Sequence, residues 1–98
     1  SGANLHAASL EGALLAFNHL RATMLPKANL QRANLRGAVL QGSNLRGADL
    51  RGADLTDANM SEALIAEARM EGAIVTRADF TNCQGAPTDV RLTLRSSD

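Results

Sequence analysis

The feature that most constrains this chain is a large apolar residue at every fifth position. Counted from Leu5, all sixteen of these centres are large and apolar. They are Leu5, Leu10, Leu15, Leu20, Leu25, Leu30, Leu35, Leu40, Leu45, Leu50, Leu55, Met60, Ile65, Met70, Val75 and Phe80. Two residues before each centre stands a small residue, which is alanine except at Asn18, Thr23 and Ser43. The fold must therefore be built from units of five residues.

A five-residue period excludes the ordinary elements of secondary structure. On an α-helix, residues five apart are separated by about 140°, so the leucines would scatter around the axis. In a flat strand, steps of five would place successive leucines on opposite faces. The small residue and the centre are two apart and share one side of an extended chain, so the chain has to bend once per repeat. Repeated bends in one sense coil the chain, with alanine and leucine in ladders inside and coils stacked about 4.8 Å apart.

The run ANLQRANLRGAVLQGSNLRGADLRGADLTDANM resembles the pentapeptide-repeat family, whose pattern is A-(D/N)-L-X-X. The resemblance holds from Ser1 to Phe80, about four fifths of the chain. It implies an all-β fold, a right-handed quadrilateral β-helix with four repeats, or twenty residues, in each coil. We therefore expect a solenoid of about four coils over residues 1–85.

Residues 86–98 depart from the repeat. Gly85 holds the next centre and Pro87 follows it, after which apolar residues alternate with polar ones. The apolar members of this alternation are Val90, Leu92 and Leu94. We expect a short C-terminal strand that caps the last coil or forms a homodimer. The N-terminus shows no equivalent cap, so the chain is expected to continue a longer solenoid or to stack end to end with a neighbour.

Residues 9–26 could form a helix instead of a coil of the solenoid. Apolar residues near helical spacing in this stretch are Leu14, Phe17, Leu20 and Met24. Ser9 and Pro26 are residues that can bound a helix. The leucine centres nevertheless keep their five-residue frame throughout, so a coil is favoured over a helix.

Apolar residues at outward positions are the best lead to function. The residue before each centre is normally Asn or Asp and is expected to face water. The exceptions are Leu14, Met24, Val39, Leu64 and Ile74. Phe17 lies in an outward or corner position of the same repeat as Leu14. Because clusters of exposed apolar residues mark interfaces, we predict a partner-binding surface centred on Leu14 and Phe17.

Stepping by twenty residues predicts vertical neighbours on the outer wall. The predicted charge pairs are Asp49–Arg69, Arg51–Glu71 and Asp57–Arg77. The formal net charge is zero, with +4 in residues 21–40 and −2 in residues 61–80. This balance gives no general attraction to nucleic acid or to an anionic membrane. A direct nucleic-acid or membrane partner is therefore not expected.

No catalytic constellation can be assembled from the sequence. His6 and His19 fall on different sides of the first coil, and Glu11 is the only acid there. Cys83 should point inward as a small apolar group. We expect no enzyme activity, no metal and no cofactor.

The sequence thus favours a non-enzymatic protein-interaction or scaffold module, a segment of a larger bacterial protein whose partner it does not identify. A lone cysteine and the lack of a signal peptide or an apolar run of membrane-spanning length favour the cytoplasm. The resemblance implies one alternative, because some pentapeptide-repeat proteins mimic duplex DNA and protect a type II topoisomerase, DNA gyrase. Such mimicry requires a strongly negative rod, and the basic residues 21–40 count against it.

Overall fold

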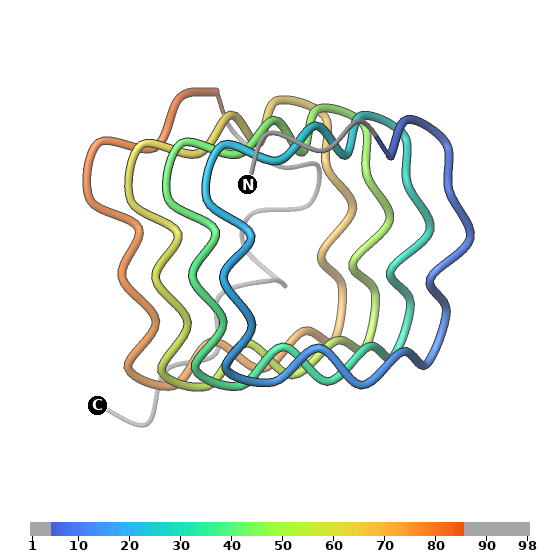
Figure 1. The fold of residues 1–98 in the computed structure, drawn as a ribbon, viewed down its shortest axis with the longest axis horizontal. Helices are drawn as coiled ribbons and strands as arrows, with labels where there is room; N and C mark the ends of the chain where they lie inside the picture. Colours follow the sequence, from blue (N-terminus) through green and yellow to red (C-terminus); the bar gives the residue numbers. More distant parts are fainter. Residues whose placement is uncertain (1–4, 86–98) are drawn as a thin grey trace.

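The computed structural model describes residues 5–85, which form a four-sided solenoid (Figure 1). Parallel pairing joins each bridged residue to the one twenty positions later, from Ser9–Asn29 to Leu64–Gln84. One coil is therefore twenty residues long, and we call residues 5–24, 25–44, 45–64 and 65–84 coils 1 to 4. The chain turns clockwise as it recedes in Figure 1, so the coil has the expected right hand.

Residues 5–85 contain no helix, and each strand is reduced to a single bridged residue. A helix within residues 9–26 is therefore wrong, because Ser9, Leu14 and His19 each bridge to the next coil. The residues proposed for a C-terminal strand, Val90, Leu92 and Leu94, lie outside the described part of the chain.

Each side of the solenoid ends in a tight turn that starts at a centre. The Ala8 N–H donates to the Leu5 carbonyl oxygen at 2.9 Å, and every later repeat makes the same bond. The third residue of each turn has a positive φ, from 55° at Arg77 to 76° at Gly72. That is the conformation of a type II turn, in which glycine is favoured at this position. Six of these corners are glycine, and the others hold residues as large as Phe17.

Backbone hydrogen bonding explains why Asn or Asp precedes most centres. In the repeat 29–33 the N–H groups of Leu30 and Arg32 donate to the next coil, and that of Asn29 donates to the previous one. The Ala33 N–H closes the turn. Only the Gln31 N–H has no backbone acceptor, and it donates to the Asn29 side-chain oxygen at 3.0 Å. The acidic or amide side chain therefore satisfies the one donor that the coil geometry leaves over.

Centres and small residues fill the interior as predicted. Leu30, Leu35, Leu40 and Leu45 are completely buried. Burying one such side chain contributes about 1.5–3 kcal/mol. In coil 1, by contrast, the centres Leu5, Leu10, Leu15 and Leu20 are only partly buried. Asn18, predicted to face inward, is exposed, because no described coil precedes it.

Among the inward positions of residues 5–85, polar side chains are buried in one column, which holds Thr23, Ser43, Ala63 and Cys83 at twenty-residue spacing. Thr56, at an outward position, is also buried. The Ser43 hydroxyl donates to the Leu20 carbonyl oxygen at 2.7 Å. The Cys83 thiol donates to the Met60 carbonyl oxygen at 3.0 Å. The Ser43 and Cys83 donors are thus each satisfied by a carbonyl oxygen of the preceding coil.

Candidate interaction surface

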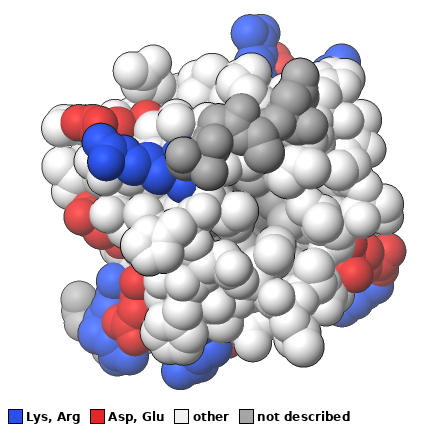
Figure 2. Space-filling model, viewed as in Figure 1, with Lys and Arg blue, Asp and Glu red and all other residues white. Residues whose placement is uncertain are grey.

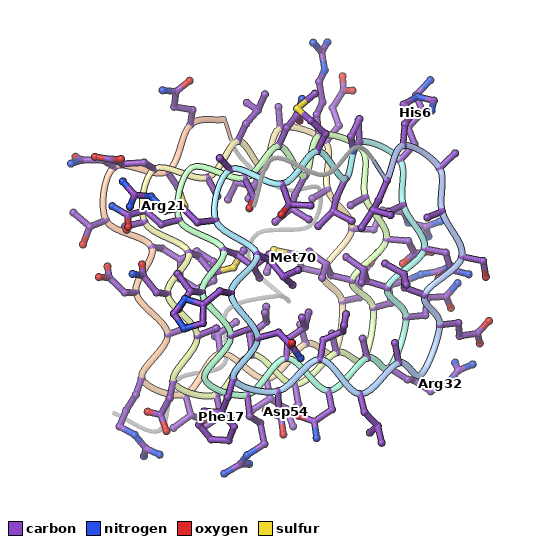
Figure 3. All side chains as sticks on the ribbon, in the orientation of Figure 1. His6, Phe17, Arg21, Arg32, Asp54 and Met70 are labelled. Carbon is purple, nitrogen blue, oxygen red and sulfur yellow. The ribbon has the colours of Figure 1, made fainter. Side chains whose placement is uncertain are left out.

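Leu14 and Phe17 form the most exposed apolar group among the described residues. Leu14 is 81% exposed and Phe17 is 74% exposed. Leu14 is held on one side of coil 1 by its bridge to Asn34, and Phe17 stands at the next corner. In Figure 3 Phe17 projects from the outer wall on the same edge of the molecule as Asp54. The structure therefore places the two predicted contact residues together on the surface.

The Phe17 ring lies against Gly37 of coil 2. A β-carbon placed on Gly37 would lie 2.5 Å from ring atoms Cδ1 and Cε1 of Phe17. Lys27 and Arg32 lie over Gly47 and Gly52 in the same way. Phe17 has a φ of 61°, a conformation that is uncommon for a bulky side chain. Because Gly37 has no side chain, the Phe17 ring can pack against it on the outer wall, away from the core.

The other predicted outward residues are unequally exposed. Met24 and Ile74 are exposed, at 39% and 42%. Val39 and Leu64 are half-buried, like most residues before a centre in the middle coils, and their role as partner contacts stays a prediction. Both stand in the middle coils, with a bridged residue of the coil before and of the coil after, which cover them. Of the six predicted residues, Leu14 and Phe17 are the most exposed and belong to one repeat, whereas the other four belong to four different repeats.

An apolar residue before a centre also gives up a hydrogen bond. Asn34 accepts from the Arg36 N–H at 3.2 Å, whereas Leu14 offers the Ala16 N–H no acceptor. Pro26 follows Met24 by two residues and has no N–H that needs one. Leu14 therefore neither packs in the core nor accepts a hydrogen bond in the turn. It differs in this from the buried centres and from the Asn and Asp residues that usually stand at its position.

Opposite charges are paired along the outer wall. Arg77 donates to Asp57 at 2.7 Å, as predicted from twenty-residue spacing, and this contact lowers the pKa of Asp57. Arg36 pairs with Asp54 at 3.3 Å, and Arg32 pairs with Glu11. The last two pairs are 18 and 21 residues apart. Sequence reasoning missed them because it considered only residues in the same column.

Arg51 shows where stepping by twenty fails. Its guanidinium donates twice to Asp49, at 2.8 and 2.6 Å, and does not form the predicted ion pair with Glu71. The hydrogen bond from Arg51 is the main cause that lowers the pKa of Asp49, and the charge of Arg69 adds to it. No Asp49–Arg69 ion pair forms among the described side chains, so that predicted pair is also wrong. The Asp49 carboxylate also accepts from the backbone N–H of Arg51 at 3.2 Å, so it already lies over the turn that carries the guanidinium.

The residues considered for catalysis do not converge. Glu11 is engaged by Arg32, and Figure 3 shows His6 and Arg32 at different corners. Cys83 is half-buried, and burial raises the pKa of its thiol. Over residues 5–85 no three His, Cys, Asp or Glu side chains are grouped as a metal ion requires. The same residues include no helix capable of crossing a membrane.

The visible face of the molecule shows no large area of one charge (Figure 2). Uncharged side chains occupy its middle, and Lys or Arg lies beside Asp or Glu along its margins. The described part of this face is therefore suited to apolar and shape recognition more than to binding a polyanion.

Comparison with known proteins gives consistent results. A family profile described as pentapeptide repeats matches in eight copies, over residues 1–42, 19–52 and 43–82. The chain is similar to the solved structure of a pentapeptide repeat protein, Rfr23, from the cyanobacterium Cyanothece 51142, with 28% identity and a TM-score of 0.83. This match covers 97% of the chain and 60% of Rfr23.

A second similar structure is HetL, a pentapeptide repeat protein involved in heterocyst differentiation regulation in the cyanobacterium Nostoc sp. strain PCC 7120. The identity is 35% and the TM-score 0.71, over 79% of the chain and 35% of HetL. The chain thus spans less than two thirds of either protein. A search of curated protein sequences gave no match.

Proposed function

Since the chain belongs to the pentapeptide-repeat family, we propose that it is a non-enzymatic module that binds another protein through its outer wall. The observation that carries the proposal is the exposure of Leu14 and Phe17 on one repeat, at 81% and 74%. Adjacent exposed apolar side chains of this size are typical of a contact surface. The rigid ladder of coils would present them at fixed positions.

The sites of these two residues support recognition over folding. Leu14 replaces a residue type that elsewhere accepts a turn hydrogen bond, as Asn34 does from Arg36. Phe17 occupies a positive-φ corner where glycine would be unstrained. Leu14 leaves one turn N–H without the side-chain acceptor that Asn34 supplies, and Phe17 holds a bulky side chain at a positive φ. Such costs are typical of functional positions.

A protein partner suits the surface better than a polyanion or a DNA-binding enzyme. The net charge is zero, and arginines such as Arg36 and Arg77 are paired with aspartates. A mimic of duplex DNA would need unpaired negative charge along the rod, so gyrase binding is not favoured. The proposal therefore includes no direct nucleic-acid or membrane partner and no cofactor.

The proposal extends to the biological role, the parent protein and the cellular compartment. HetL, which is 35% identical, is described as involved in regulation, and binding without chemistry would suffice for a comparable role here. The match to only part of Rfr23 and HetL fits a segment of a larger bacterial protein. A single cysteine, Cys83, is compatible with the cytoplasm.

The test is to capture partners with the full chain as bait, purify each candidate and measure its affinity directly. The double variant Leu14→Asp/Phe17→Asp should weaken binding at least tenfold, the loss expected for about 1.4 kcal/mol of contact energy. Ile74→Asp, in the same column but on coil 4, is the matched control and should bind normally. Equal affinities for the double variant and the native chain would reject this surface.

A further inference from the structure

One side of the solenoid carries Met24 and Leu64 in a single column, two coils apart, with Asn44 between them. Met24 is 39% exposed and Leu64 is half-buried. The other outward residues of this side stand two and three positions further on in each repeat. We call residues 24–27, 44–47 and 64–67, whose outward side chains form this surface, the Met24 side.

The Met24 side lies within the ladder of coils and not at one of its ends. The N–H groups of Leu5 and Ala7 donate to the carbonyl oxygens of Met24 and Pro26, so the chain already continues before Met24. Gln84 bridges to Leu64 and continues the column after it. Met24 is therefore exposed because it points outward, and its exposure does not depend on a further coil.

Opposite charges stand at the corner that ends this side. Lys27 and Glu67 are both exposed, two coils apart in one column, and Gly47 lies between them. Lys27 forms no ion pair with another residue of 5–85. Glu67 has a long contact of 3.9 Å with Arg46, and these two side chains are 72% and 64% exposed. A cation and an acid on this side are therefore both available to a partner.

We propose that the Met24 side packs against the Met24 side of a second copy of this chain. The two-fold axis would cross the side at Asn44, at right angles to the solenoid axis, so that the two solenoids run in opposite directions. This axis sets Met24 against the partner's Leu64 and Lys27 against the partner's Glu67. Each contact occurs twice, as in any two-fold interface.

The charges select this axis over the other two-fold arrangement of the same side. An axis parallel to the solenoid would set each residue against the same coil of the partner, with the two corners exchanged. Lys27 would then face the partner's Ala22, and Glu67 would face the partner's Glu62, which is a second acid. Like charges opposite each other are unfavourable, whereas the crossed axis joins opposite charges and apolar residues together.

Arg46 is the charge that the pairing leaves unmatched, because it lies near the axis and faces its own copy. The two Lys27 and two Arg46 side chains then share two Glu67 carboxylates. Since the Arg46 side chain is 64% exposed, it can turn toward solvent at the corner. Removing its charge should therefore strengthen the dimer, an effect that an acidic partner of unrelated sequence would reverse.

The dimer would leave the surface of Leu14 and Phe17 free. The four sides of a coil follow each other every five residues, so the side of Leu14 is opposite the Met24 side. Figure 3 shows Phe17 and His6 at opposite edges of the molecule, and His6 stands twenty residues before Pro26. Two Leu14–Phe17 surfaces would thus face outward, which favours a partner that offers two binding sites. The inference goes beyond the proposed function, and either can fail without the other.

Sedimentation velocity of the full chain over a concentration series tests the dimer. One side of four is less than a quarter of the 5172 Å² that the chain exposes, so the contact is small and the dimer should dissociate on dilution. Met24→Asp should shift the equilibrium at least tenfold toward monomer. Ile74→Asp is the matched control, because Ile74 also precedes a centre and is 42% exposed but lies on the opposite side.

Charge reversal tests the predicted ion pairs. Lys27→Glu and Glu67→Lys should each weaken the dimer about tenfold, because each sets like charges opposite each other twice. The double variant Lys27→Glu/Glu67→Lys should restore it. Both residues already have a positive φ, 60° and 62°, so the exchange leaves the backbone conformation unchanged. Arg46→Gln should strengthen the dimer.

Chemical cross-linking tests the position of the axis. Packed sheets lie about 10 Å apart, so two Asn44→Cys side chains at the axis should be joined by a bismaleimide of about that span. The reaction requires a Cys83→Ala background. Asn59→Cys is the control, because Asn59 is a half-buried asparagine that also precedes a centre but belongs to the adjacent side.

Four results would overturn the dimer: a monomer at every concentration, a dimer insensitive to Met24→Asp, a double charge exchange that fails to restore it, or equal cross-linking at positions 44 and 59. A dimer dissociated by Leu92→Asp would also reject it and place the contact in the C-terminal segment. A monomeric chain that still binds another protein through Leu14 and Phe17 would refute the dimer and leave the proposed function intact.

Discussion

Replacing Gly37 by alanine should show whether the Phe17 ring of coil 1 packs against the corner at Gly37 in coil 2. Gly37 and Gly42 have similar backbone conformations, with φ of 65° and 70°. An added β-carbon at Gly37 would lie 2.5 Å from two carbons of the Phe17 ring, whereas one at Gly42 would have nothing within 4 Å. Gly42→Ala therefore measures the cost of the backbone conformation alone, and Gly37→Ala adds the conflict with the ring.

The size of the difference follows from the exposure of Phe17. Both substitutions pay about 1–2 kcal/mol for a β-carbon at positive φ, partly offset by about 0.4–1 kcal/mol from a stiffer unfolded chain. Phe17 is 74% exposed, so about a quarter of its side chain, roughly 50 Å², lies against the coil. Moving the ring away loses about 1.3 kcal/mol at about 25 cal/mol per Å². We expect Gly37→Ala to cost about 1 kcal/mol more than Gly42→Ala.

Urea unfolding followed by circular dichroism would give the free energies of unfolding. The set comprises the two alanine variants, Phe17→Ala and the double variant Phe17→Ala/Gly37→Ala. The extra cost of Gly37→Ala should vanish once Phe17 is absent, which is a coupling of about 1 kcal/mol. Equal costs at Gly37 and Gly42, or an extra cost that persists without the ring, would refute the packing of Phe17 on Gly37.

Three further outcomes follow from the same structure. Leu40→Ala should destabilise the chain by about 2–5 kcal/mol in urea unfolding, and Leu10→Ala by clearly less, because Leu40 is fully buried and Leu10 only partly; similar losses would contradict this difference in burial. Leu14→Asn should stabilise a dilute sample by about 0.5–1.5 kcal/mol relative to Leu14→Ala, through the restored turn hydrogen bond, as a higher Tm would show. Hydrogen bonds from Arg51 lower the pKa of Asp49, and those from Thr56 and Arg36 lower that of Asp54 despite burial. The stability that these two carboxylates contribute should be fully present above their ordinary pKa of 3.8. It should be lost as the pH falls through their lowered pKa values in the folded chain, so a Tm that does not fall in a series of acidic buffers would contradict this.

The repeat made most of the fold predictable. A period of five fixes which side chains face inward, and the burial of Leu30, Leu35 and Leu40 agrees with it. It also identified Leu14 and Phe17 as anomalies, because a regular pattern makes each departure visible. Ends are harder to predict than the middle, as the exposed Asn18 shows, since burial there depends on what lies beyond the coil.

Sequence by itself determined the coil, its register and its interior, because these depend only on backbone repeats and on the alternation of large and small residues. Tertiary structure decided which outward groups are accessible and which charges meet. Arg51 chooses Asp49 over Glu71 because side-chain reach and corner geometry, not the period, set the distances between polar atoms. In the same way, Val39 is covered by the adjacent coils while Leu14 stands at the rim and is exposed.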